Sequence, residues 1–236
     1  LSLVVGCGLL VQGASRTDAG VHARGQAAHF DLPSDVALAR RDSWPQEWEA
    51  QINRRLPADI RVRALCDAPE GFHALLSAEG KTYAYRLHVG TRPDDPLGRL
   101  CRHRIPAAWA QALGGDLDRL REAAAPFVGR HDFARFARED LGRVKKSTVR
   151  TIHSIDVVDE GEGQCRIDVR LEGALWNMVR NVVGCLVAAA CGRIPLDAIQ
   201  ELLESPERDG PRVAFQCFPA EGLCLERVHY AGDMDF

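Results

Sequence analysis

The sequence lacks several patterns that would assign a protein quickly. Its 8 cysteines are scattered, with no Cys-x-x-Cys pair and no Cys/His quartet at the spacing of a zinc site. No apolar run is long and charge-free enough to span a bilayer, and no signal peptide is visible. We therefore expect no metal, no membrane and a reducing compartment. The expected location is the cytoplasm, with an organelle as the alternative.

A basic excess is also missing. The chain has 30 Lys and Arg against 33 Asp and Glu, a formal net charge of −3, whereas a dedicated nucleic-acid binder usually carries a positive excess. Any RNA contact must therefore come from local basic patches. The remaining composition, 46% hydrophobic and 27% charged over 236 residues, is typical of a globular protein with one large or two small domains.

The most informative stretch is Ser-Arg-Thr-Asp-Ala-Gly-Val-His-Ala-Arg-Gly-Gln at residues 15–26. It lies between two short apolar runs and predicts a strand, a tight loop and a returning strand. Asp18 is the only acid in the first 30 residues, with Arg16 and Arg24 on either side. Because nearby positive charge favours an ionised carboxylate, the loop can offer a ligand a fixed anion. The alternative is that Asp18 only forms an Asx turn before Gly20.

This stretch resembles the signature of the tRNA pseudouridine synthase A family, whose usual form begins Gly-Arg-Thr-Asp-Ala-Gly-Val-His. Ser15 replaces the usual glycine, a small residue for a small residue. The resemblance implies that Asp18 is the catalytic aspartate. It also implies that Arg16, His22 and Arg24 contact RNA, where an arginine would hold phosphate or fill the place of an extruded base.

A second resemblance covers residues 72–87. Phe72-His73-Ala74 and the alternating strand at 81–87 are similar to the family's Phe-His-Ala-Arg and its tyrosine-containing strand. Leu75 stands where the family usually has arginine, so one contact to RNA or a carboxylate is expected to be missing. By alignment Tyr83 matches the family's active-site tyrosine, and we assign Tyr85 to the core. Alternatively, because the two tyrosines share one face of the predicted strand, both point into the core.

The stretch at residues 174–192 predicts a helix that is apolar nearly all round and therefore buried. Arg180 is its only charge. A buried guanidinium needs a carboxylate or a cleft, unless the side chain reaches solvent at the helix edge. Met178-Val179-Arg180-Asn181-Val182-Val183-Gly184 resembles the family's Met-Val-Arg-Asn-Ile-Val-Gly helix, whose arginine reaches the catalytic aspartate. The resemblance thus implies an Arg180–Asp18 pair.

The pattern of the chain predicts further helices at 46–56, 107–125 and 195–205, and strands at 60–65, 151–158 and 165–171. Residues 222–228 resemble the family's closing strand, whose usual form is Ala-Pro-x-x-Gly-Leu-x-Leu, and Pro219-Ala220-Glu221 loosely keeps the start of that motif. Two basic clusters are candidate phosphate contacts, although such clusters often only face solvent. They comprise Arg99, Arg102 and Arg104, and Arg143, Lys145 and Lys146.

The resemblance implies an α+β fold of two ferredoxin-like subdomains, whose antiparallel sheets join and enclose a cleft. We place an incomplete N-terminal subdomain carrying the aspartate loop at residues 1–78 and a C-terminal one at 79–236. The family normally opens with a strand and a helix before the aspartate strand, whereas residues 1–8 alone precede it here. We therefore expect a fragment or a truncated gene model.

The implied activity is that of an isomerase which converts uridine to pseudouridine in the anticodon stem-loop of tRNA. No cofactor or metal is implied, and the enzyme is expected to be a homodimer. Asp18 would act as nucleophile or electrostatic stabiliser, and Tyr83 would pack on the target base. Alternatives are an inactive RNA-binding homologue and a synthase acting on another RNA. A glycoside hydrolase would need a second acid near the loop, and a phosphate-binding loop would need Gly-Lys-Ser/Thr after the glycines.

Overall fold

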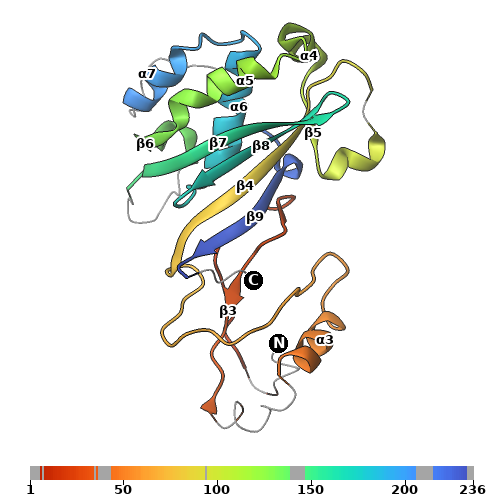
Figure 1. Cartoon of the computed structure of the whole chain (residues 1–236), viewed down its shortest axis with the longest axis vertical. Helices are drawn as coiled ribbons and strands as arrows, with labels where there is room; N and C mark the ends of the chain where they lie inside the picture. The colour runs from red at the N-terminus through yellow and green to blue at the C-terminus, as the bar shows by residue number, and fades with distance from the viewer. Residues whose placement is uncertain are drawn as a thin grey trace. The chain divides into compact units, whose positions relative to one another are not determined.

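The structure is a computed structural model of the chain, and it describes residues 6, 8–34, 36, 44–93, 95–138, 147–205 and 215–232 (Figure 1). The chain divides into two compact units. Unit 1 comprises Leu1–Arg16, Gln26–Ala78 and Tyr230–Phe236, and unit 2 comprises Thr17–Gly25 and Glu79–His229. Helices and strands both occur, in a mixed sheet, so the predicted α+β class is confirmed.

Unit 2 is built on a sheet whose strands lie in the order β2-β9-β4-β8-β7-β6. Their bounds are β2 (His22–Ala23), β9 (Leu223–Tyr230), β4 (Ala78–His88), β8 (Gln164–Leu171), β7 (Val149–Gly161) and β6 (Gly129–Asp132). β4, β8, β7 and β6 are antiparallel neighbours, β2 runs parallel to β9, and a short strand, β5 (His103–Arg104), pairs with β4.

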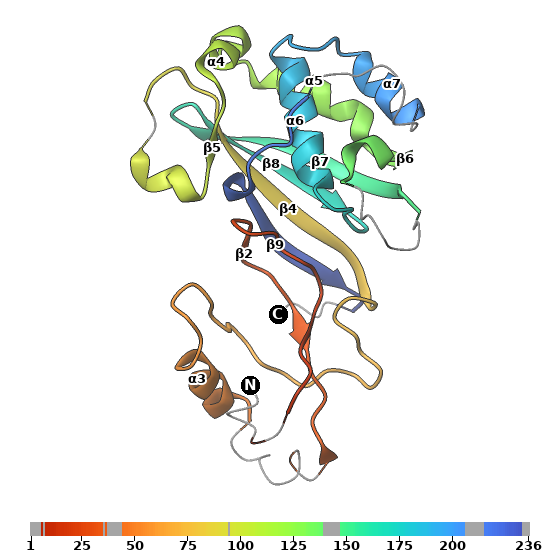
Figure 2. The same cartoon turned by 180° about the vertical axis from the view of Figure 1, so that it is seen from behind.

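The strand register gives this sheet two different faces. Tyr85 lies opposite Ile167 and Arg86 opposite Arg166, and because side chains alternate along a strand, the first pair and the second pair point to opposite sides. The side with Tyr85 and Ile167 is covered by α5 (Leu117–Ala124) and α6 (Met178–Ala190), and α6 crosses it in Figure 2. Both residues are 0% exposed, so this face forms the core of unit 2.

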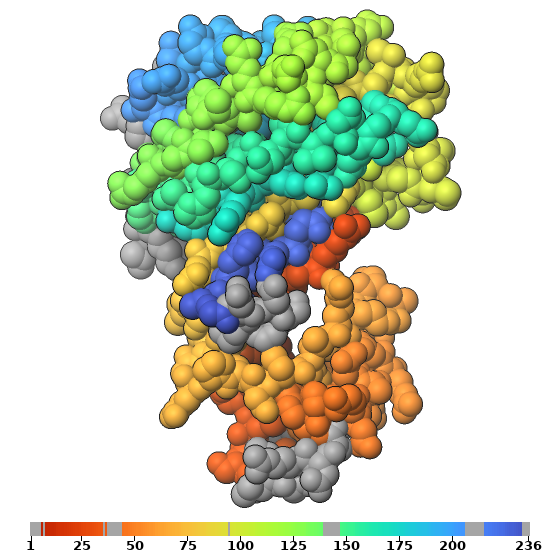
Figure 3. All heavy atoms as spheres, in the orientation of Figure 1, coloured from red at the N-terminus to blue at the C-terminus, as the bar shows by residue number. Residues whose placement is uncertain are grey.

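Strand β7 lies beside α5, where the helices stop covering the sheet. Its atoms form a continuous band (teal) on the visible surface of unit 2 in Figure 3, beside those of α5. Only Ile152 and Val157 of β7 are buried, as expected for a strand with one solvated face.

The remaining helices of the described chain are short. They are α3 (Gln46–Asn53), α4 (Ala107–Leu113), α7 (Ala198–Glu204), and the 3-10 turns η2 (Pro96–Leu100), η3 (Ala125–Phe127), η4 (Ala134–Phe136) and η5 (Ala220–Gly222). None of the helices in the described part of the chain has the length and apolar character needed to cross a membrane.

Unit 1 has a smaller core. β1 (Gln12–Gly13) pairs antiparallel with β3 (Ala28–His29), so the aspartate loop does lie between two short paired strands. Trp48 and Ile52 of α3 are its buried pair, and partly buried apolar side chains such as Leu9 and Phe30 pack against them.

Three sequence predictions about secondary structure were wrong in detail. The helix predicted at 107–125 is two helices, because Gly114 and Gly115 both adopt positive φ (63° and 78°) and end α4. The strand predicted at 60–65 is absent, since Val62 exchanges both backbone hydrogen bonds with the Asn53 side chain. The helix predicted from residue 174 begins at Met178, after Asn177 at φ 62°.

Candidate active site

Asp18 lies in a tight turn of unit 2. The Val21 N–H donates to the backbone carbonyl of Asp18 at 2.9 Å, and Gly20 adopts φ 84° in this turn, a conformation that favours glycine. The main chain therefore closes the turn, and the carboxylate remains available for other contacts. A Cβ on Gly20 would lie 3.3 Å from the Cβ of Ala220, so the turn sits close against η5.

The carboxylate faces Arg180 of α6. Arg180 Nη1 lies 3.7 Å from Asp18 Oδ2, and the two side chains are 18% and 40% exposed. This confirms the ion pair expected from the sequence. At 3.7 Å the contact is longer than a hydrogen bond, so the carboxylate oxygens keep room to accept from a ligand.

Arg180 is held in place by other groups. Its Nε donates to the Phe218 carbonyl at 2.6 Å, and its Nη1 donates to Asn177 Oδ1 at 3.2 Å. A guanidinium presents five donors in a fixed plane, so these two bonds fix the plane while part of it faces Asp18. Arg180 is thus positioned by the fold, and Asp18 lies at its accessible side.

The carbonyl that anchors Arg180 belongs to residues 215–219, which we call the anchor segment. It packs directly on α6, and its Phe218 N–H reaches the Arg180 carbonyl at 3.4 Å. Gly184, one turn after Arg180 on the same helix face, makes this approach possible. A Cβ there would overlap the backbone carbonyl of Gln216.

Tyr85 supports the anchor segment from the sheet. Its hydroxyl donates to the Pro219 carbonyl at 2.7 Å, and its ring lies 5.8 Å from that of Phe218. Burial, with a smaller contribution from Glu221, raises the pKa of Tyr85, so the hydroxyl stays protonated as a donor. Gly222 makes room for this ring, since a Cβ there would lie 2.6 Å from it.

Two further groups line the same region. His103 packs its ring 4.9 Å from Phe218, and burial lowers the pKa of His103 despite Glu221 at 3.8 Å. Burial likewise raises the pKa of the Cys217 thiol, against the opposing effect of Arg180. Both groups are therefore neutral near pH 7, whereas Asp18, Arg180 and Glu221 are the acidic and basic side chains of this region.

This arrangement suits a reaction that needs a positioned carboxylate. Asp18 can stabilise positive charge or attack an electrophilic carbon, and 40% exposure lets a substrate reach it. Within the described residues, no three His, Cys, Asp or Glu side chains gather in a way that could hold a metal ion.

Comparisons with known proteins show which family the chain belongs to. Residues 123–231 match the family described as tRNA pseudouridine synthase. Over 254 aligned positions the chain is 37% identical to the tRNA pseudouridine synthase A of Nitratidesulfovibrio vulgaris, covering 96% of this chain and 85% of that protein. It is 36% identical to the Geobacter sp. protein of the same name (98% and 85% covered) and 39% identical to that of Syntrophotalea carbinolica (92% and 79% covered). The chain belongs to the tRNA pseudouridine synthase A family.

The family motif at residues 15–26 carries three other predicted site residues. Arg16 is exposed. His22 Nε2 lies 2.6 Å from the Leu100 carbonyl and donates to it, so that ring nitrogen is used within the protein. Arg24 is 65% exposed and lies 3.8 Å from Glu226. Arg180, rather than Arg24, is the arginine whose contact with Asp18 the structure gives.

The family tyrosine, Tyr83, lies on the helix-covered side of β4, like Tyr85, and is 6% exposed. Tyr85, which the sequence analysis left to the core, is indeed 0% exposed but also supports the anchor segment. The basic residues Arg143, Lys145 and Lys146 lie outside the described residues. In the other basic cluster, Arg102 is paired with Glu160 at 3.0 Å.

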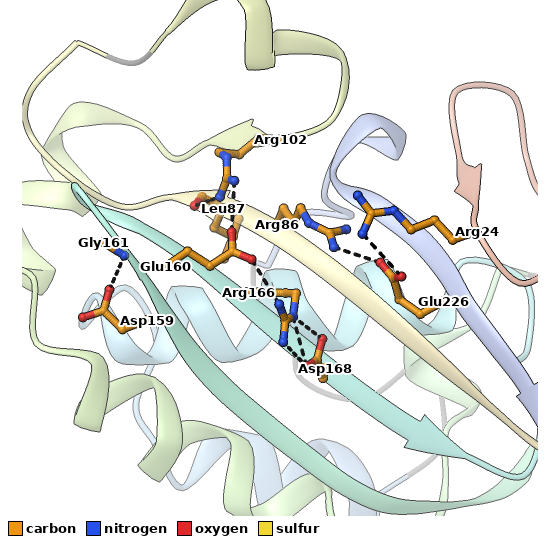
Figure 4. Close-up of polar contacts among 10 residues, drawn as sticks. All are labelled: Arg24, Arg86, Leu87, Arg102, Asp159, Glu160, Gly161, Arg166, Asp168 and Glu226. Atoms are coloured by element: carbon orange, nitrogen blue, oxygen red, sulfur yellow. Dashed lines mark hydrogen bonds and ion pairs between the residues drawn. The ribbon is translucent and has the colours of Figure 1, made fainter. Parts of the chain in front are cut away.

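The opposite face of the sheet carries a different set of charges (Figure 4). Arg166 binds Asp168 with Nε–Oδ1 and Nη2–Oδ2 distances of 2.8 and 2.9 Å, and also reaches Glu160 at 3.2 Å. Arg86 lies 2.9 Å from Glu226. Each of these arginines is paired with a neighbouring carboxylate, so we interpret this network as structural.

The sequence analysis missed the anchor segment altogether. Its last residue, Pro219, and the following Ala220-Glu221-Gly222 resemble the start of the family's closing strand motif, which was the available signal. The carbonyl of Phe218 could not be assigned to Arg180 from sequence, because 38 residues separate them.

Proposed function

We propose that this chain is a tRNA pseudouridine synthase in which Asp18 is the catalytic carboxylate. In that isomerisation the bond between uracil N1 and ribose C1′ breaks, a bond from C5 to C1′ forms, and the C5 proton leaves. Atoms and electrons balance without an oxidant or co-reactant. The observation that supports the proposal is an accessible carboxylate beside an arginine that the fold holds at 3.7 Å.

The roles of the other residues extend this proposal. Arg180 provides a positive charge 3.7 Å from Asp18 and so balances the carboxylate when the substrate displaces water. Tyr83 packs on the target base, and Arg16, His22 and Arg24 contact the RNA. The target is a uridine of the anticodon stem-loop.

The proposal also includes an assembly. We propose a homodimer of chains, each with ferredoxin-like subdomains at residues 1–78 and 79–236, in a cytoplasmic or organellar compartment. A shared tRNA surface would compensate for the net charge of −3, since phosphate contacts from one subunit are few.

The activity is tested by tritium release from tRNA labelled at C5 of uridine, since C5 loses its hydrogen when it becomes bonded to C1′. We expect release that parallels pseudouridine formation and depends on tRNA. Tight tRNA binding without any release would instead identify an inactive RNA-binding homologue. Release from another RNA but not from tRNA would assign a different substrate.

The RNA surface is tested by reversing the charges of Lys145 and Lys146 to Glu. We expect weaker tRNA binding and a shallower dependence of log affinity on log salt, by close to one unit per lost phosphate contact. The modified uridine should not change, because phosphate contacts carry no sequence information. An unchanged salt slope, or a monomeric mass at working concentration, would contradict this surface and this assembly.

A further inference from the structure

Three polar side chains of unit 1 meet in a cluster that the proposed chemistry does not use. Gln12 of β1 lies between His29 of β3 and His73, with its Oε1 3.2 Å from His73 Nε2 and its Nε2 3.5 Å from His29 Nε2. We call these three residues the His–Gln cluster. All three are partly buried, so each residue keeps some contact with solvent.

The backbone fixes the tautomer of both histidines. The Ala74 N–H donates to His29 Nδ1 at 3.1 Å. The Leu75 and Leu76 N–H groups donate to His73 Nδ1 at 3.1 and 3.2 Å. A ring nitrogen that accepts carries no hydrogen, so each neutral imidazole carries its hydrogen on Nε2. Both histidines therefore present Nε2–H donors to Gln12.

One amide cannot satisfy both of these donors. The Oε1 of Gln12 accepts from His73, which leaves the Gln12 NH₂ group facing the His29 Nε2–H. Turning the amide over would pair His29 and oppose two donors at the shorter, 3.2 Å distance. In either orientation one ring Nε2–H faces the Gln12 NH₂ group, so two donors meet without an acceptor between them. Leaving such groups unpaired is costly.

The surroundings hold these donors in place. The His29 ring lies 4.5 Å from that of His73 and edge-on to Phe72 at 6.2 Å. Phe72 packs on Tyr230, whose hydroxyl donates to the Ala74 carbonyl at 2.7 Å. The same short segment thus supplies the N–H that fixes His29 and is itself held by Tyr230. Rotation of the rings to relieve the mismatch would break these bonds.

We infer that the His–Gln cluster binds an acceptor oxygen of the RNA backbone, which takes hydrogen bonds from His29 Nε2–H and the Gln12 NH₂ group. This inference rests on the proposed function. A phosphate oxygen fits best, because an anionic acceptor strengthens hydrogen bonds from neutral donors. In protein–DNA complexes about half or more of the hydrogen bonds go to the phosphates and sugars of the backbone, and neutral side-chain and main-chain donors supply part of them.

The first test is Gln12→Glu, which keeps the shape of the side chain and gives it two acceptor oxygens. Both Nε2–H groups then find partners within the protein, so we expect a higher thermal midpoint without RNA. The same change fills the acceptor position with a negative charge and should weaken tRNA binding about 10-fold. Gln51→Glu on α3 makes the same charge change elsewhere in unit 1 and should weaken binding much less.

The second test is His29→Asn, whose side-chain oxygen can still accept from the Ala74 N–H while the Nε2–H donor is lost. We expect about 3- to 10-fold weaker tRNA binding with unchanged single-turnover tritium release at saturating tRNA. Neutral methylphosphonate substitution of successive RNA phosphates should then weaken binding to the wild-type chain at one position. At that position it should have no effect on His29→Asn.

Two results would overturn the inference. A lower midpoint in Gln12→Glu would mean that the donor assignment is wrong. Equal tRNA binding by Gln12→Glu and Gln51→Glu, with no phosphate coupled to His29, would mean that water, and not an RNA phosphate, accepts the hydrogen bonds of the His–Gln cluster. Both results can occur while wild-type tritium release is intact, so they are distinct from failure of the proposed function.

Discussion

The two faces of the unit 2 sheet both carry arginine–aspartate pairs, but the pairs are built differently. On the helix-covered side, Arg180 is fixed by a backbone carbonyl and meets Asp18 at 3.7 Å, without a hydrogen bond. On the opposite face, Arg166 and Asp168 share two parallel hydrogen bonds below 3.0 Å (Figure 4). The first arginine is positioned independently of its acid, whereas the second is saturated by it.

This difference indicates which pair is suited to catalysis and which pair mainly stabilises the fold. A carboxylate saturated by a bidentate arginine has little capacity left for a substrate. A carboxylate that is only electrostatically balanced stays charged and can still accept from, or attack, a ligand. The looser pair is therefore the one suited to catalysis, although it is the weaker contact in the folded protein.

Among variants that keep Asp18, Arg180→Met should have the largest effect. Loss of a charge-assisted contact should lower tritium release about 10- to 100-fold, with a stability cost of about 1 kcal/mol, since Asp18 is 40% exposed. Arg166→Met is the matched control. It should shift the thermal midpoint by a similar amount and leave the release rate within about twofold. Equal losses of activity in both variants would remove the distinction between the faces.

Gly184→Ala tests the anchor segment. Glycine to alanine within a helix normally stabilises by about 1 kcal/mol, but here the new Cβ would overlap the Gln216 carbonyl. We expect a lower midpoint and a lower release rate, because the segment that holds Arg180 must move. Gly173→Ala, whose Cβ would meet nothing within 4 Å, should change neither. A stabilised Gly184→Ala with full activity would show that the segment does not position Arg180.

Tyr85→Phe should have the smallest effect. It removes one neutral hydrogen bond, to the Pro219 carbonyl, and keeps the ring packed on Phe218. We expect a cost of about 1 kcal/mol in stability and a reduction of a few-fold in release rate without a change in tRNA affinity. A rate loss as large as that of Arg180→Met would mean that the hydroxyl itself contacts the substrate.

Sequence reasoning predicted Asp18 and Arg180, but it did not predict the anchor segment that holds Arg180 in place. The turn with Asp18 and the helix with Arg180 were predicted because each has a local motif, and because a lone charge in an apolar helix needs a partner. The anchor segment depends on a long-range approach to Gly184, which leaves no periodicity to detect.

The errors in secondary structure have local causes. The strand predicted at 60–65 alternates correctly, but the Asn53 amide takes the hydrogen bonds that a neighbouring strand would have made. The break between α4 and α5 was readable from Gly114 and Gly115, whose positive φ ends a helix. Periodicity alone therefore predicted more helix and strand than the structure contains.

The most direct test of the central claim compares Asp18→Asn with Asp168→Asn, two isosteric changes in the two arginine–aspartate pairs of unit 2. The measurements are single-turnover tritium release at saturating tRNA, and tRNA affinity. We predict that Asp18→Asn loses release by about 10²- to 10³-fold or more with affinity nearly unchanged, while Asp168→Asn keeps its rate. Near-normal release by Asp18→Asn, or a loss confined to Asp168→Asn, would contradict the assignment of Asp18 as the catalytic carboxylate.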